Sequence, residues 1–312
     1  MVEEGHAVRA IKRPTGKLPY FVDSKVLEKV EWVEGDVLDV NALADAMQGI
    51  DTIIHAAAVV SFGKADREKM YQINIEGTAN VVNVALENGV RRLVYISSVA
   101  ALGRKKNSTI VDEATKWEDS KSNTHYSITK YRAELEVWRG FAEGLEGVIL
   151  NPATILGYGN WNDGSCALFK NSWKEFSWFT HGINGFADVE DVAKAAVALM
   201  KTDITEQRYL VCNDNWSFKK LFDTIAEGFG KKKPHREATP LLGEIAWRME
   251  KLKSIITGQK PLLTKESAKV AQTETIFDNT KLLKTLPDFK YKPLEATIKD
   301  ACKKYMAQMS KI

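Results

Sequence analysis

The chain has 312 residues, of which 44 % are hydrophobic, so it can bury a substantial core in one large domain or two smaller ones. Its 44 Lys and Arg side chains against 41 Asp and Glu give a net charge of only +3. The basic runs Arg104–Lys106 and Lys231–Lys233 lack the interleaved aromatic residues of a nucleic-acid surface, and we interpret them as solvated loops.

The cysteines and the hydropathy argue against several further classes. Cys166, Cys212 and Cys302 are odd in number, far apart and not in metal-ligand spacing, so we expect neither a disulfide framework nor a metal site. No apolar run approaches the roughly 18 residues of a membrane span, and the start lacks the regions of a signal peptide. We therefore expect a protein of the reducing cytoplasm.

The chain opens with the end of a helix and a strand. Residues 1–4 are typical of a last helical turn, Gly5 of the residue that stops it, and residues 6–12 of a strand. Apolar runs then alternate with amphipathic stretches, over residues 30–34, 42–48, 52–58, 76–87, 92–97, 126–142 and 147–151. Such repeats join parallel strands through helical crossovers, so we predict an α/β fold with a doubly wound parallel sheet that binds ligands at the carboxyl ends of its strands.

Beyond Asn151 the alternation loosens into a segment rich in Trp and Phe. Helix and strand return over residues 189–211, and helices are predicted near residues 217–229, 241–256 and 293–309. We expect a second, smaller region made from these later pieces.

Three side chains could form a proton-transfer site. Tyr126 and Lys130 stand four residues apart at the start of an amphipathic helix, so both project from one face. An ammonium group beside a phenol favours the phenolate and draws a pKa that starts near about 10 towards the range of a general acid or base. The preceding strand ends in Ser97 and Ser98, which places a hydroxyl donor at the carboxyl edge of the sheet. Taken singly, each feature is also typical of an ordinary helix surface or turn.

Seven motifs occur together and in family order. They are EGDVLD (34–39), IIHAAA (53–58), NIEGTANV (74–81), VYISS (94–98), YSITK (126–130), NPATILG (151–157) and GFADVEDVA (185–193). With them the chain resembles the extended short-chain dehydrogenases/reductases of the NAD(P)-dependent epimerase/dehydratase superfamily, in the branch of dihydroflavonol 4-reductases and 3β-hydroxysteroid dehydrogenases. The resemblance implies a Rossmann-like dinucleotide-binding domain at residues 1–150 and 184–213, and a substrate-binding region at 151–183 and 214–312.

The resemblance also implies roles for individual residues. Tyr126 would donate a proton, Lys130 would lower its pKa and bind the nicotinamide ribose, and Ser98, rather than Ser97, would orient the substrate oxygen. Asn74 matches a residue behind the active site, although a helix cap explains it equally well. The other implied cofactor contacts are Asp36 and Val37 beside the adenine, Ala56, Ala57 and Ala58 along the cleft, and Pro152, Ala153, Thr154 and Ile155 against the nicotinamide.

In this family a strand and a G-x-x-G-x-x-G turn precede the equivalent of VRAIKRP (8–14). That turn lets a pyrophosphate approach the backbone at a helix amino terminus, and Gly5 and Gly16 are wrongly placed to replace it. We expect that roughly 20 to 30 residues of the native protein precede this start, with loss of the loop in this lineage as the alternative. The chain as given is then expected to bind its cofactor poorly.

The end of the first strand bears on the choice of cofactor. Family members that prefer NAD usually carry an acid there, whereas this chain has Lys12 and Arg13. Arg13 resembles the arginine that grips the 2′-phosphate in dihydroflavonol reductases, so we expect NADP, with NAD and a merely solvated basic pair as alternatives.

The approach to the last motif, WKEFSWFTHGIN (173–184), lacks the basic diphosphate clamp of nucleotide-sugar epimerases. Trp178 and His181 are candidate substrate contacts, beside the further aromatic residues Trp173, Phe176 and Phe179. Core packing would explain the aromatic side chains equally well, and His181 could be an ordinary packed or surface histidine. We therefore expect reduction of a ketone or aldehyde on a largely apolar small molecule. A nucleotide-sugar epimerase or dehydratase, and a non-catalytic NAD(P)-sensing or scaffold protein, are the alternatives.

A late segment with a helical pattern of apolar residues bears on which surfaces the protein contacts. Leu242, Ile245, Met249, Leu252 and Ile256 recur at helical intervals, which predicts a helix packed over the substrate cleft, with attachment to a membrane surface as the less favoured alternative. The expected partner is a small-molecule carbonyl or alcohol, and we expect neither nucleic acid nor membrane. The resemblance leaves a homodimer open.

Overall fold

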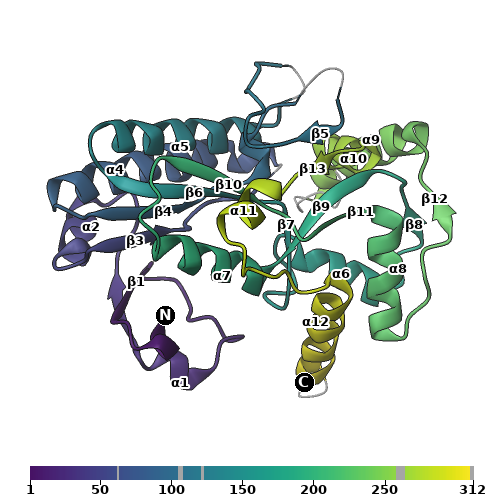
Figure 1. Cartoon of the computed structure of the whole chain (residues 1–312). Coiled ribbons are helices and arrows are strands. Elements are labelled where there is room, and N and C mark those ends of the chain that lie inside the picture. Colours follow the sequence, from purple (N-terminus) through teal and green to yellow (C-terminus); the bar gives the residue numbers. More distant parts are fainter. Residues whose placement is uncertain (62, 105–107, 121–122, 258–263, 310–312) are drawn as a thin grey trace.

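The computed structural model describes the chain except for residues 62, 105–107, 121–122, 258–263 and 310–312, so Lys105 and Lys106 of the first basic run lie outside the described residues (Figure 1). Its centre is a parallel sheet with the strand order β10-β6-β4-β3. The strands are β3 (Thr52–His55), β4 (Arg92–Ile96), β6 (Glu146–Pro152) and β10 (Gln207–Val211). The predicted α/β fold with a parallel sheet is thus confirmed.

Helices cover both faces of this sheet. The helices α2 (Val40–Met47), α4 (Gly77–Glu87) and α5 (His125–Ala142) lie on one face, and α7 (Val189–Met200) lies on the other (Figure 1). Side chains of β4 alternate accordingly, since Leu93 and Tyr95 pack with α2, α4 and α5 whereas Val94 packs with α7. The connections from α4 and α5 to the next strands turn through Gly89 and Gly144, whose φ angles of 66° and 102° favour glycine.

Strands β1 (Val8–Lys12) and β2 (Val30–Glu34) form a separate two-stranded parallel sheet, preceded by a 3-10 turn over Val2–Glu4 that ends at Gly5. Among the described strands, β1 pairs only with β2 and β3 only with β4, and Ile11 and Ile54 on these strands are 39 % and 37 % exposed. Side chains supply the attachment: Arg9 Nη1 donates to the carbonyl oxygens of Ala46 (3.0 Å) and Gln48 (2.9 Å) at the end of α2.

The second region contains a three-stranded sheet in the order β11-β9-β7, packed against three helices. Its elements are β7 (Thr154–Leu156), β9 (Ile183–Asp188), β11 (Asp214–Ser217), α6 (Cys166–Trp173), α8 (Phe218–Phe229) and α12 (Leu294–Met309). The remaining elements are α1 (Ser24–Leu27), α3 (Arg67–Tyr71), β5 (Ile110–Val111), β8 (Trp178–Phe179), β12 (Arg236–Glu237), α9 (Pro240–Thr257), α10 (Lys265–Gln272), β13 (Ile276–Phe277) and α11 (Thr280–Thr285). The chain therefore leaves the larger sheet after β6 and returns to it through α7.

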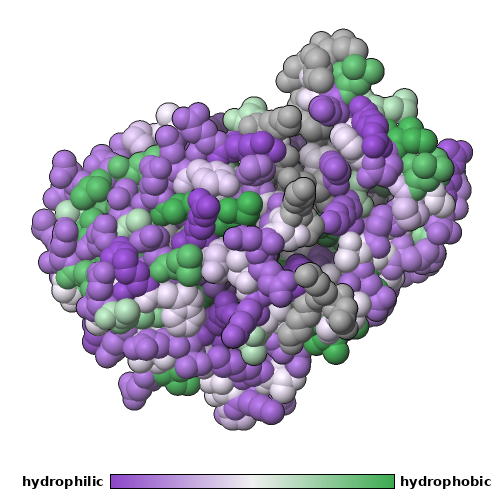
Figure 2. All heavy atoms as spheres, turned by 90° about the horizontal axis from the view of Figure 1, so that it is seen from above, coloured by the Kyte–Doolittle hydropathy of each residue, from purple (hydrophilic) through white to green (hydrophobic). Residues whose placement is uncertain are grey.

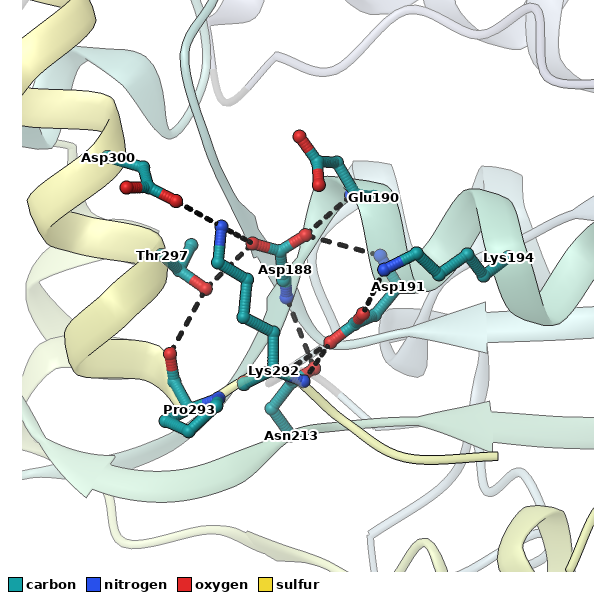
Figure 3. A network of polar contacts seen from close by, with 9 residues as sticks. All are labelled: Asp188, Glu190, Asp191, Lys194, Asn213, Lys292, Pro293, Thr297 and Asp300. Atoms are coloured by element: carbon teal, nitrogen blue, oxygen red, sulfur yellow. Dashed lines mark hydrogen bonds and ion pairs between the residues drawn. The ribbon is translucent and has the colours of Figure 1, made fainter. Parts of the chain in front are cut away.

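Buried Asp188, at the end of β9, stabilises the connection through which the chain returns to the larger sheet (Figure 3). Its Oδ1 caps α7 by accepting hydrogen bonds from the backbone N–H groups of Glu190 (2.6 Å) and Asp191 (3.2 Å). Its Oδ2 accepts a hydrogen bond from Thr297 Oγ1 (2.7 Å) and lies 4.0 Å from Lys292 Nζ. One carboxylate therefore joins the start of α7 to α12.

Asp191 extends this network from the first turn of α7. Its Oδ2 accepts hydrogen bonds from the backbone N–H of Lys292 (2.7 Å) and from Asn213 Nδ2 (2.8 Å), and Asn213 Nδ2 also donates to the carbonyl of Lys292 (2.8 Å). Asn213 belongs to the connection between β10 and β11. Three distant segments thus meet at the junction of the two sheets (Figure 3).

We expect Asp188→Ala to lower the free energy of unfolding by about 2 to 4 kcal/mol, because it removes a helix cap and leaves buried donors without an acceptor. Urea unfolding followed by circular dichroism measures this change. Asp300→Ala is the matched control, since it removes an exposed partner of Lys292 (2.5 Å) and should cost less than about 1 kcal/mol. Equal losses in the two variants would contradict the assigned role of Asp188.

Candidate active site

Helix α5 begins beside the carboxyl end of β4. Thr124 caps it, since its side-chain oxygen accepts a hydrogen bond from the backbone N–H of Ser127 (2.9 Å). Helical geometry then places Tyr126, Lys130 and Glu134 on one face at successive turns. This face carries three side chains of the candidate site.

Tyr126 and Ser98 meet at this edge. A hydrogen bond joins the Ser98 hydroxyl to the phenol hydroxyl of Tyr126, and both residues are half-buried. Ser98 also caps the turn Val99–Ala101, because its Oγ accepts a hydrogen bond from Ala100 N (3.1 Å). Ser97 is buried, and its backbone N–H donates to the carbonyl of Leu150 (2.7 Å). The structure therefore brings Ser98, and not Ser97, to the phenol.

Lys130 is 1 % exposed and connects α5 to β4. Its Nζ donates to the hydroxyl of Tyr95 (2.9 Å) and to the backbone carbonyl of Ile96 (3.0 Å). An ammonium group has three N–H donors, and these two acceptors use two of them. Burial lowers the pKa of Lys130 to about 8, and the carboxylate of Glu134 opposes that shift.

The pKa of Tyr126 differs from the sequence-based expectation. Burial raises it above the usual tyrosine value, and the lowering influence comes from the Ser98 hydrogen bond. The net shift of the Tyr126 pKa is therefore opposite to the expected acidification, because spacing along a helix does not reveal that burial of the phenol outweighs the groups that lower its pKa. Tyr126 consequently holds its proton at neutral pH.

The surroundings of Lys130 contain a further titratable group. His55, at the end of β3, is buried, stacks on Tyr95 with ring centroids 5.4 Å apart, and has its Nε2 3.0 Å from Thr78 Oγ1. Burial, together with the charge of Lys130, lowers the pKa of His55 to about 3. His55 is thus a neutral neighbour that adds no second positive charge.

The sequence analysis missed Glu134, which lies one turn beyond Lys130 and is 1 % exposed. One carboxylate oxygen accepts a hydrogen bond from Asn151 Nδ2, and the other lies 3.4 Å from Arg208 Nη1. Asn151 Nδ2 also donates to the carbonyl of Ser98 (3.0 Å). Burial raises the pKa of Glu134, and these donors and cations oppose that shift. A third polar residue at the same four-residue interval was the available signal.

Asn74 ties the segment after β3 to α5. Its Oδ1 accepts a hydrogen bond from Val59 N (2.7 Å), while its Nδ2 donates to Val59 O (2.9 Å) and Thr129 Oγ1 (3.1 Å). It lies within the π-helical turn Gln72–Glu76 and caps no helix. The helix-cap alternative was wrong, since the side chain forms hydrogen bonds with the segment after β3 instead.

The expected adenosine contacts lie around β1 and β2. Lys12 ends β1, where its Nζ is 3.6 Å from Glu34 Oε1, and Arg13 follows with an exposed side chain. Asp36 accepts a hydrogen bond from Leu38 N (3.1 Å), and the carbonyl of Val37 accepts one from Asn80 Nδ2 (3.0 Å). These four residues lie at or just beyond the carboxyl ends of two neighbouring parallel strands, which is the edge where ligands bind in such sheets.

The remaining expected cofactor contacts lie along the larger sheet. Ala56, Ala57 and Ala58 directly follow β3 and are exposed. Pro152 ends β6 and is buried, Ala153 N donates to the carbonyl of Val211 (2.9 Å), and Thr154 Oγ1 accepts from Asn184 Nδ2 (2.8 Å). Ile155 belongs to β7, so this stretch crosses from one sheet to the other.

The expected substrate contacts lie on the β8–β12 ribbon. Trp178 is half-buried under the guanidinium of Arg236, whose Cζ is 5.7 Å from the ring centroid. His181 is exposed, with its Nε2 3.8 Å from Glu237 Oε1. Among the described residues, these contacts join them to β12 and not to Tyr126. Trp173 packs on Phe229 with centroids 5.3 Å apart, so core packing accounts for it.

A cavity of about 520 Å³ lies near Arg208, away from the phenol. Glu113, Trp138, Gln207, Arg208 and Lys281 are among its lining residues, and none of the predicted site residues is. Arg208 therefore extends from buried Glu134 towards a surface hollow.

The residues present fit the two nucleoside halves of a nicotinamide cofactor. Exposed alanines leave the carboxyl edge of β3 open to a close approach. Within the described part of the chain, the acceptors of Lys130 use two of its three N–H groups, which leaves one for a ligand. Arg13 presents an exposed guanidinium after β1, at the other end of the site.

Comparison with known proteins shows the family to which the chain belongs. The family model described as "NAD dependent epimerase/dehydratase family" matches residues 1–212. The chain belongs to this family. The resemblance to extended short-chain dehydrogenases/reductases is thereby confirmed, and the protein is an NAD(P)-dependent oxidoreductase of that type.

Individual relatives agree with the family assignment. A Synechocystis sp. protein provisionally named dihydroflavonol 4-reductase is 30 % identical, over 92 % of this chain and 84 % of its own length. "Sterol demethylase protein B" of Methylococcus capsulatus is 29 % identical, over 68 % of this chain and 65 % of its own length. The protein in the crystal structure of gox2253 is 26 % identical in sequence to this chain. The two structures match with a TM-score of 0.81, over 98 % of this chain and 92 % of that one.

We expect Glu134→Gln to lower the pKa of Lys130 below about 8, by roughly one unit, because it removes the opposing negative charge. Since the folded-state pKa of Lys130 is below its usual 10.5, the unfolded chain binds more protons between these values, and stability rises with pH across this window. In Glu134→Gln this rise should begin at lower pH. Urea unfolding from pH 6 to 9 measures this pH dependence of stability. Comparing each variant with its Lys130→Met derivative isolates the contribution of Lys130.

Glu143→Gln is the control for that measurement, because Glu143 lies at the exposed end of the same helix, bonded to Arg139 (2.8 Å). It should leave the pH at which the rise begins unchanged. An unchanged profile in Glu134→Gln would show that Glu134 does not act on Lys130.

Proposed function

We propose that the protein reduces a ketone or aldehyde on a largely apolar small molecule, with NADP as cofactor. The observation that carries this proposal is the hydrogen-bonded Ser98–Tyr126 pair, with the buried Lys130 one turn further along the same helix. The names of relatives that refer to a dihydroflavonol and a sterol support an apolar carbonyl or alcohol substrate.

The roles of the residues follow from their protonation states. A bound nicotinamide supplies the hydride that adds to the carbonyl carbon. Tyr126, which burial keeps protonated, donates its proton to the carbonyl oxygen as negative charge develops there. When substrate is bound, the Ser98 hydroxyl would exchange its hydrogen bond with the phenol for one donated to the same carbonyl oxygen, and so orient it. The phenolate left on Tyr126 is stabilised by the positive charge of Lys130 until solvent returns the proton.

The cofactor would be held by residues at both ends of the site. The third N–H of Lys130 suits a ribose hydroxyl, and residues 152–155 would lie against the nicotinamide. At the other end, the guanidinium of Arg13 suits a 2′-phosphate, which favours NADP over NAD.

We expect Tyr126→Phe to lower kcat by about 10² to 10⁴, because it removes the proton donor and leaves the helix intact. NADPH oxidation with a panel of ketones, aldehydes, and flavonoid and steroid carbonyls measures this loss. Tyr131→Phe on the same helix is the matched control, because its ring stacks on Trp117 (centroids 4.4 Å apart) and needs no hydroxyl to do so.

Three results would contradict this proposal. A fully active Tyr126→Phe variant would show that Tyr126 is not the proton donor. Turnover of nucleotide sugars in preference to carbonyls would favour the epimerase alternative. Cofactor binding without turnover of any compound in either panel would favour a sensing role.

For the cofactor, we expect Arg13→Ala to weaken NADPH binding by about 10- to 100-fold, the worth of a charge-assisted hydrogen-bonded pair, and to leave NADH binding nearly unchanged. Titration of NADPH and NADH fluorescence measures both affinities. Lys25→Ala, an exposed cation in α1, is the control. Equal losses for both cofactors would argue against a 2′-phosphate contact.

A further inference from the structure

Helix α9 exposes a continuous apolar face. Five of its side chains, each between 41 % and 71 % exposed, are Leu241, Leu242, Ile245, Met249 and Leu252. At 100° per residue they fall within an arc of about 100° on one side of the helix. Figure 2 shows apolar side chains gathered on this part of the surface. The expectation that this face packs over the substrate cleft was therefore wrong; the side chain of Ile256 lies outside the described part.

The opposite side of α9 faces the protein. Trp247 is half-buried with its indole nitrogen buried, and its ring lies 6.0 Å from Lys265 Nζ of α10. The helices α9 and α10 pack together in Figure 1. The helix is thus anchored by one face and presents the other to its surroundings.

Basic side chains border the apolar face on both sides. By the same helical geometry, Arg248 and Lys251 flank one edge and Lys253 flanks the other. The acids nearby pair with two of them, Glu244 with Arg248 (2.6 Å) and Glu250 with Lys253 (3.7 Å). The apolar residues therefore lie between two basic edges.

The charge of the wider segment is also asymmetric. Residues 231–272 contain ten Lys and Arg against four Asp and Glu, a net +6. The whole chain carries +3, so the remainder is net −3. A positive region on an otherwise negative molecule orients it towards an anionic surface.

We propose that α9 docks in the plane of an anionic lipid surface, with its apolar face among the acyl chains and the flanking cations at the headgroups. An apolar stripe with cations on both edges is the pattern of an interfacial helix, whereas a nucleic acid would not bury the stripe. Among the helices of the described chain, none is long and apolar enough to cross a membrane, so α9 lies on the bilayer and does not span it. This differs from the sequence-based expectation of no membrane contact, because exposure cannot be deduced from periodicity.

Vesicle co-sedimentation of the full chain tests the proposal. We expect binding to vesicles of phosphatidylcholine with about 30 % phosphatidylglycerol, weaker binding to phosphatidylcholine alone, and a decrease with added salt. Met249→Glu and Leu252→Glu should each lower the partition coefficient at least about tenfold. Leu283→Glu on α11, where Leu283 is 37 % exposed, is the matched control and should bind like the wild type.

Two further measurements keep the outcome decisive. Circular dichroism and thermal melting verify that the variants fold, and Leu252→Ser replaces either acidic variant that does not. The proposal is overturned if the wild type ignores anionic vesicles or if the Met249 and Leu252 variants bind equally well. It is also overturned if sedimentation shows a dimer that Met249→Glu dissociates, because a second copy then covers the face. None of these results depends on catalytic activity.

Discussion

The burial of one ammonium group is the constraint on which the candidate site depends. Removing the charge of Lys130 from water costs several kcal/mol unless hydrogen-bond acceptors and counter-charges compensate. The hydroxyl of Tyr95, the carbonyl of Ile96 and the carboxylate of Glu134 provide this compensation. Since two of these groups belong to β4 and one to α5, the charge is satisfied only when helix and strand are aligned. That alignment also brings Tyr126 to Ser98.

A second polar network serves the junction of the two sheets. The carboxylates of Asp188 and Asp191 gather the start of α7, the turn after β10 and the start of α12. The stretch from Pro152 to Ile155 crosses between the same two sheets. The expected nicotinamide contacts are therefore positioned by a junction that buried carboxylates hold in place.

Periodicity and motifs predicted the parallel sheet and most of its elements. The strand over residues 30–34 has the predicted bounds, and α9 and α12 differ from theirs by only a residue. What could not be predicted depends on tertiary partners. The strand Ile183–Asp188 pairs with β7 and β11 in the smaller sheet, and nothing in its own residues reveals that choice. The partners of Lys130 are likewise 34 and 35 residues away in sequence.

The separate β1–β2 sheet has an energetic consequence. Side-chain hydrogen bonds such as those of Arg9, rather than a strand ladder, hold it to the molecule. We therefore expect it to open locally at a lower free energy than the four-stranded sheet. Any ligand that grips Arg13 and Lys130 together must bridge two units of unequal stability. Part of its binding energy then goes into ordering the weaker unit, so ligand occupancy and local order are thermodynamically linked.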